Sequence, residues 1–188
     1  MQISSVVIIT LCALMRRVSA APQELYTLIT SKQYGLNLTH DAETGNIGFQ
    51  RGSFNRHWID MPVTQGFKNW HCFRSSKQTE VQQVMWWIRF DNYTSGQAAK
   101  TPTYNYGYYH PSLFEVERVG DTYYVVSLEP SDPKKKLAWS IENDSPTGED
   151  FRLKLRPYSR SPSQEFAMIQ EPGDPKDMFS SFPPVGLN

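Results

Sequence analysis

Hydrophobic and polar residues alternate in short runs between residues 113 and 170. Successive runs begin at Phe114, Tyr124, Leu137 and Phe151, and turn-forming residues separate them. A period of two is typical of a strand with one buried and one exposed face. No helical period lies between the runs, and Pro, Gly, Asn and Asp cluster where they stop. The pattern predicts a barrel or sandwich of short strands.

The same pattern appears nearer the N-terminus. Its matching positions place apolar residues on one face of each predicted strand: Leu36 and Leu38 match Leu137 and Trp139, Ile47 and Phe49 match Leu153 and Leu155, and Trp58 matches Phe166. Repetition at tens of residues indicates a fold built from similar units. The middle, residues 62–111, is less regular and forms a third unit only with insertions. Its apolar run 84–90 is predicted to be the most buried strand.

The units also carry short aromatic signatures near their ends. Gln164-Glu165-Phe166 is a Gln-x-aromatic triplet, and Arg56-His57-Trp58 keeps the aromatic residue without the Gln. This arrangement resembles the ricin-B-like lectins, whose units end near a Gln-x-Trp motif. The resemblance implies an all-β, β-trefoil-like barrel of about twelve short strands over residues 21–170. The alternative is another single-domain β-barrel or sandwich.

The resemblance also implies sugar pockets that combine an early Asp, an aromatic platform and a late amide. Asp41 and Asn55 stand at these places in the first unit, and Asp144 and Gln164 in the third. Such side chains bond vicinal hydroxyls, while an aromatic face packs on the sugar ring. The first unit has Gln50 near the platform position, which cannot stack. In the alternative interpretation, Asp41 is a turn residue and Gln164 a structural hydrogen-bonder.

A tyrosine-rich stretch, residues 104–109, is a second candidate binding surface. Tyr106 and Tyr108 are its candidate contact residues, because tyrosine provides rigid, amphipathic area at low entropic cost. The alternative is an aromatic strand that packs into the core.

The ends of the chain indicate export. Residues 1–20 combine a short apolar run with a small-residue cleavage site, as signal peptides do, and residues 171–188 are predicted to be an extended or disordered tail. Cleavage would leave one cysteine, Cys72, which we expect to be buried. Three sequons, at Asn37, Asn92 and Asn143, are candidate glycosylation sites.

Composition and motifs exclude several classes of function. Lys and Arg together number 19, equal to Asp and Glu, so no basic surface predicts nucleic-acid binding. The four histidines lack metal-ligand spacing, no phosphate-binding or nucleophile motif occurs, and no cofactor or metal is predicted. We expect no membrane span after signal cleavage.

These observations predict a secreted, extracellular, non-enzymatic binding protein. Its partner would be a glycan or an extracellular protein. A chain that engages a partner protein in this way would be effector-like. One alternative is a trefoil-type protease inhibitor that acts through an exposed loop, Gln97 to Asn105. Another is a hydrolase whose site residues meet only in space.

Overall fold

The computed structural model describes residues 25–41, 44–52, 56–65, 68–76, 86–101, 111–129 and 132–172. These residues are almost entirely strand and loop, as predicted. The described part holds ten strands rather than about twelve, and one short 3-10 helix: β1 (Leu25–Ser31), β2 (Asn37–His40), β3 (Ile47–Gln50), β4 (His57–Gln65), β5 (Lys68–Ser75), β6 (Glu115–Val119), β7 (Thr122–Glu129), β8 (Asp132–Asn143), β9 (Phe151–Pro157), η1 (Pro162–Gln164) and β10 (Phe166–Pro172).

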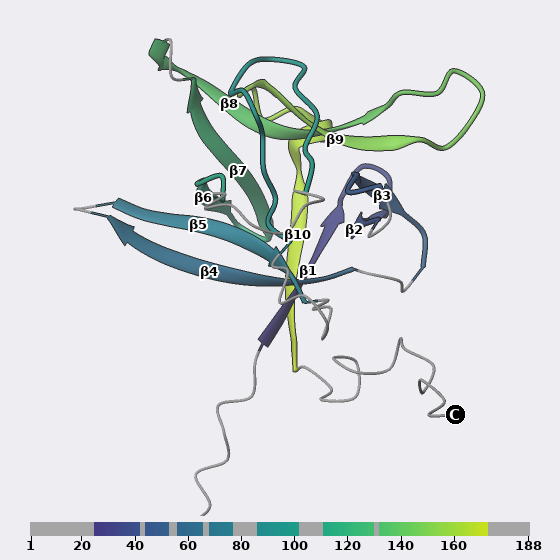
Figure 1. Ribbon diagram of the computed structural model, residues 1–188, viewed down its shortest axis with the longest axis horizontal. Coiled ribbons are helices and arrows are strands. Elements are labelled where there is room, and N and C mark those ends of the chain that lie inside the picture. Colours follow the sequence, from purple (N-terminus) through teal and green to yellow (C-terminus); the bar gives the residue numbers. More distant parts are fainter. Residues whose placement is uncertain are drawn as a thin grey trace, which may run out of the picture.

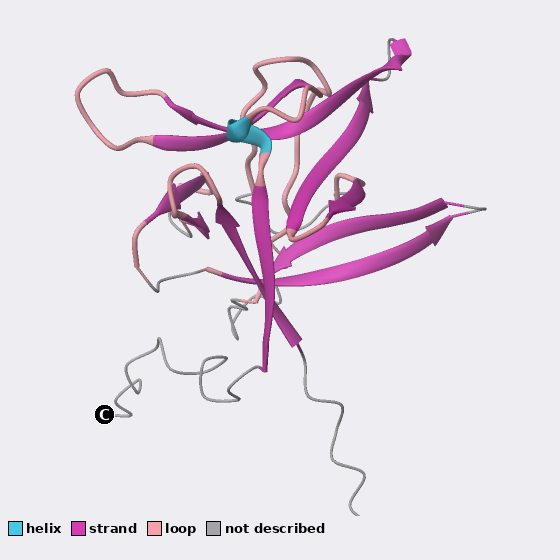
Figure 2. Cartoon of the chain, turned by 180° about the vertical axis from the view of Figure 1, so that it is seen from behind, coloured by secondary structure: helices cyan, strands magenta, loops and turns pink. Residues whose placement is uncertain are grey.

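Seven of the strands form a closed antiparallel ring. The order is β10-β7-β8-β9-β3-β2-β1, and β1 closes the ring by pairing with β10 over its whole length. The β4–β5 hairpin joins the ring at β1 and extends to one side, whereas β8 and β9 extend to the other (Figure 1). The helix η1 lies beside β8 and leads into β10 (Figure 2). Closure matters because it leaves the ring without an unpaired edge.

The repeated apolar positions all point into one core. The matched residues of the first and third units are 4% exposed or less: Leu36, Leu38, Ile47, Phe49, Trp58, Leu137, Trp139, Leu153, Leu155 and Phe166. Trp139 lies among aromatic rings, 5.1 Å from the centroids of Phe73 and Phe114. The alternation therefore predicts the core-facing side of these strands correctly.

In strand β7, the alternating run that begins at Tyr124 does not mark the side that faces the main core. Val125 instead joins the main core, while Tyr124 and Val126 form a smaller cluster with Ala138. Both faces of β7 are covered, because residues from β8 and the segment after β9 pack on its outer side. A strand buried on both sides does not show a simple alternation.

The apolar run 84–90 is not a continuous strand in its described part, residues 86–90. Ile88 and Phe90 are buried, yet Trp86 is only half-buried. The segment is held by isolated bridges, Trp87 with Arg74 and Arg89 with Lys100. The segment has no regular strand structure, and it contributes Ile88 and Phe90 to the core.

Cys72 is 2% exposed on β5, which confirms the expected burial. Burial raises the pKa of its thiol to about 11, with a further contribution from the negative charge of Asp60. Strand β10 continues through Pro172, two residues into the predicted tail. The rest of that tail and the predicted signal peptide lie outside the described residues. In the part of the chain that is described, no helix has the length and apolar character to cross a membrane.

Candidate functional site

The turn between β2 and β3 is built from short polar side chains. The Asp41 carboxylate accepts hydrogen bonds from the Thr44 backbone N–H (3.3 Å) and hydroxyl (2.5 Å). The Thr44 hydroxyl in turn accepts one from the Asn46 side-chain amide, at 2.9 Å. Gly45 adopts φ +70°, a left-handed conformation that favours glycine. The turn thus fixes one carboxylate and one amide at the surface.

Residues 100–101, which are distant in the sequence, fix this turn through hydrogen bonds. Thr101 is 4% exposed, and both its backbone N–H and its hydroxyl donate to the Gly45 carbonyl, at 2.7 and 3.0 Å. Asn46 also forms an isolated bridge with Lys100. Because residues from a distant part of the chain fix the turn, its polar groups are preorganised.

Strand β9 runs beside β3 and brings a second set of residues to the turn. Gly48 pairs with Arg152, and Phe49 pairs with Phe151. The two backbones are so close at Gly48 that a Cβ atom there would lie 2.7 Å from the Phe151 carbonyl oxygen. Only glycine allows this approach without a shift, and it sets the start of β9 against the Asp41 turn.

A concavity of about 230 Å³ lies between the turn and the start of β9. We call it the Asp41 concavity. Its lining is mostly polar and comes from the β2–β3 hairpin and from residues around the start of β9: Thr39, Asp41, Thr44, Asn46, Gly48, Phe49, Gln50, Glu149, Asp150, Phe151 and Arg152. It is smaller than the roughly 300–1,000 Å³ typical of pockets for drug-sized ligands. A single sugar ring matches it better than a large apolar molecule.

Phe151, the first residue of β9, also lines the Asp41 concavity, and it packs against the core. Phe151 is half-buried there, and its ring centroid is 4.8 Å from that of Tyr34, which is 41% exposed. The two rings form a tilted pair across the β1–β2 turn. Sequence reasoning found no platform in the first unit, because the ring comes from the third unit.

The charge of the concavity is negative. Asp41, Glu149 and Asp150 contribute three carboxylates against the one guanidinium of Arg152. Arg152 binds Asp150 through two nitrogens, at 2.7 and 3.2 Å. This balance disfavours an anionic ligand and favours donors such as sugar hydroxyls.

Of the predicted binding residues that the structure describes, Asp41 alone lines this concavity. Asp144 lies in the β8–β9 loop, where its carboxylate bonds Lys154. Gln164 is 1% exposed, and its side-chain amide accepts from the Ser159 N–H and donates to the Pro157 carbonyl. Asn55, Tyr106 and Tyr108 fall outside the described residues.

The sequons differ in their surroundings. Asn92 is exposed, as is its partner Thr94, and Asn143 is exposed at the end of β8. Asn37 is half-buried and bonded through both ends of its amide, to Thr30 and to the Gly52 carbonyl.

The predicted inhibitor loop is not free in its described part, residues 97–101. The Ala99 N–H donates to the Leu153 carbonyl, and the Leu155 N–H donates to the Gln97 carbonyl. Ala99 is also 3% exposed. Residues tied to β9 and buried in this way cannot enter a protease cleft.

Comparisons with known proteins identify the fold. No protein-family model matches the sequence, and no curated protein matches it either. Among solved structures, the designed threefold-symmetric β-trefoil ThreeFoil matches with a TM-score of 0.53 and 15% identity, over 77% of this chain and 97% of its own. The agglutinin of Rhizoctonia solani matches with a TM-score of 0.52 and 14% identity, over 81% and 98%. A mosquitocidal holotoxin matches with a TM-score of 0.54 and 15% identity, over 83% of this chain and 18% of the toxin. The chain therefore has a β-trefoil fold.

Proposed function

We propose that this protein is a non-enzymatic glycan-binding protein and that the Asp41 concavity holds a neutral sugar. One observation carries the proposal: a fixed carboxylate and amide lie in one small concavity that the half-buried Phe151 also lines. Vicinal hydroxyls donate to the oxygens, and the C–H face of the sugar packs on the ring. The lectin-type fold supports this interpretation.

The proposal retains the secreted setting predicted from residues 1–20. A glycan outside the cell is the matching ligand, and an effector-like role toward a partner protein belongs to the same setting. Both rest on sequence reasoning alone.

The test measures the affinity of the chain for neutral monosaccharides by isothermal titration calorimetry. The sugars are first selected on a glycan array, and variants of Asp41 and Phe151 are compared with the native chain. Asp41→Asn keeps an acceptor for the Thr44 N–H and removes the charge, so we expect affinity to fall about tenfold or more. Phe151→Leu keeps an apolar side chain and removes the ring face, so a loss of about two- to tenfold is expected.

The matched control is Asp144→Asn, which removes an equal charge from the neighbouring loop outside the concavity. It should leave affinity unchanged. An array without any neutral ligand, or an equal loss in Asp144→Asn, would contradict the proposal.

A further inference from the structure

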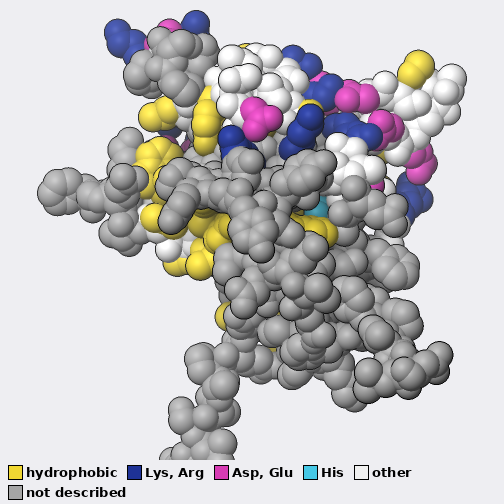
Figure 3. All heavy atoms as spheres, in the orientation of Figure 1, with side chains coloured by type: hydrophobic (Ala, Val, Ile, Leu, Met, Phe, Trp, Pro, Cys, Tyr) yellow, Lys and Arg dark blue, Asp and Glu magenta, His cyan; other side chains and the backbone are white. Residues whose placement is uncertain are grey.

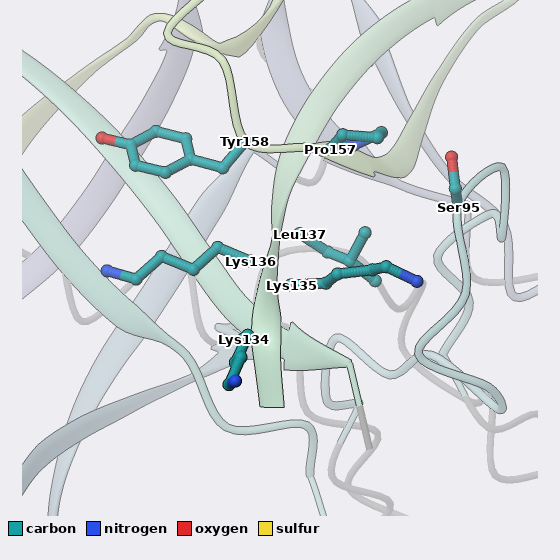
Figure 4. A pocket seen from close by; sticks show the side chains of 7 residues that line it. All are labelled: Ser95, Lys134, Lys135, Lys136, Leu137, Pro157 and Tyr158. Atoms are coloured by element: carbon teal, nitrogen blue, oxygen red, sulfur yellow. The ribbon is translucent and has the colours of Figure 1, made fainter. Parts of the chain in front are cut away.

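A second, larger cavity lies at the start of β8, and we call it the lysine pocket. Its volume is about 520 Å³, within the range of ligand sites. The lining residues are Ser95, Lys134, Lys135, Lys136, Leu137, Pro157 and Tyr158 (Figure 4). It shares no residue with the Asp41 concavity and has the opposite charge.

The lysines carry positive charge that neighbouring acids leave largely uncompensated. Lys135 approaches Asp132 at 3.6 Å, but both side chains are more than a third exposed, so this pair is weak. Lys134 and Lys136 form no ion pair with any residue in the described ranges. Dark blue side chains project from the corner where β8 begins (Figure 3). Farther along β8 and β9, by contrast, basic residues are paired, as Lys154 is with Asp144.

Glu117, an acid on β6, is already engaged. The Glu117 carboxylate accepts hydrogen bonds from the Tyr158 hydroxyl and the Arg160 guanidinium. The Tyr158 bond, then the Arg160 bond and charge, and last the Lys136 charge hold the Glu117 pKa below its ordinary value. Glu117 therefore stays ionised and offsets part of the Lys136 charge, but it forms no ion pair with Lys136, so the ammonium group can still contact a ligand.

The ammonium groups do not converge on one point. Lys135 extends toward Ser95 on one side of β8, whereas Lys136 extends on the other side, next to Tyr158 (Figure 4). This follows from the strand, since successive side chains point to opposite faces. A single small anion cannot contact both amines. A ligand with several separated anionic groups can.

The surfaces between the lysines are rigid and partly apolar. The Tyr158 N–H donates to the Lys136 carbonyl at 2.9 Å, which pins the tyrosine beside β8. The Tyr158 ring also packs edge-on against Tyr124, with centroids 5.8 Å apart. On the other side, the Gly96 N–H donates to the Leu155 carbonyl at 2.7 Å, which anchors the loop that carries Ser95. Pro157 and Leu137 lie between these walls.

We propose that the lysine pocket binds a sulfated oligosaccharide that crosses the start of β8. One sugar ring would pack against the proline and tyrosine surfaces, with sulfates on Lys135 and Lys136. Lysine suits this role because it acts as a point charge on sulfate or phosphate oxygens. Duplex nucleic acid fits less well, since the chain is neutral overall and acids bound the patch at Asp132 and Glu117.

The experiment measures binding of the full chain to a heparin-derived hexasaccharide by surface plasmon resonance at several salt concentrations. The desulfated hexasaccharide, inorganic sulfate, a DNA duplex and polyglutamate serve as comparison ligands. The variants are Lys135→Gln, Lys136→Gln and both together. The charge-matched control is the double variant Arg51→Gln/Lys100→Gln, because both side chains are exposed and lie outside the pocket.

We expect the native chain to bind the sulfated sugar and not its desulfated form. Each single lysine variant should lose about fivefold, the double variant about thirtyfold, and the control nothing. The slope of log affinity against log salt concentration should correspond to about two fewer ion contacts in the double variant than in the native chain.

Three results would overturn the proposal. The first is absence of binding, or an equal loss in the control. The second is a silent single variant, because a ligand across both sides of β8 needs both amines. The third is equal or tighter binding of free sulfate, DNA or polyglutamate, which would assign the pocket to a different ligand.

Discussion

Replacing Gly48 by alanine tests how the Asp41 concavity is assembled. The added Cβ would lie 2.7 Å from the Phe151 carbonyl oxygen, and ordinary contact begins at 3.4 Å. Strand β9 would have to withdraw by about 0.7 Å, and its backbone cannot rotate away as a side chain would. The β3–β9 contact is only two residue pairs long, so the shift would open the concavity as well as strain the barrel.

The expected cost is about 1–3 kcal/mol of unfolding free energy, the usual range for overpacking. Urea denaturation followed by tryptophan fluorescence measures it, and with a slope of about 1–3 kcal/mol/M the midpoint should fall by roughly 1 M. Affinity for a neutral sugar should fall in the same variant, because Phe151 moves away from Asp41.

Gly148→Ala is the matched control. Its added Cβ would meet the Ser145 hydroxyl at 2.9 Å, and that hydroxyl can rotate away. We expect a change below about 0.5 kcal/mol. Equal stabilities of the two variants would refute the close approach of β3 and β9.

Three further predictions concern reactivity, pH and modification. Cys72 in the native chain should resist a thiol reagent at pH 8 and react fully in urea, and rapid labelling of the native chain would contradict this. The free energy of unfolding should also fall as pH rises from 9.0 toward 11, because the thiol ionises at lower pH in the unfolded chain than in the folded one. The Arg156 hydrogen bond lowers the pKa of Glu142, so the Glu142–Arg156 pair stabilises the fold above pH 4.5 and this stabilisation is lost in acid. Between pH 7 and pH 3, the urea midpoint of Glu142→Gln should therefore fall less than that of the native chain. Equal falls would count against the pair. After expression through a eukaryotic secretory pathway, peptide mass spectrometry should find glycan on Asn92 and none on Asn37 in folded protein, because both ends of the Asn37 amide are bonded.

Local patterns predicted the core because burial follows alternation within each strand. Leu38, Phe49 and Leu153 could be assigned to the interior without knowing which strands pair. The same reasoning failed for Val125, since β7 is covered on both faces and its alternation carries no single direction. It carries no information on the burial of Gln164, which depends on contacts with the segment that joins β9 to β10.

The candidate site was predictable only in part. Asp41 belongs to a local turn, and its residue types indicate that turn directly. Phe151 reaches the same concavity through the β3–β9 pairing, which joins residues about a hundred positions apart, and no local pattern encodes such a contact.

The most direct test of the account is a nuclear magnetic resonance titration of the isotope-labelled chain with a neutral monosaccharide found on the array. The account predicts that backbone amides of residues 44–48 and 150–152 shift together, with one saturation curve. Shifts confined to one of these segments, or an unchanged spectrum at saturating sugar, would contradict a single site built across β3 and β9.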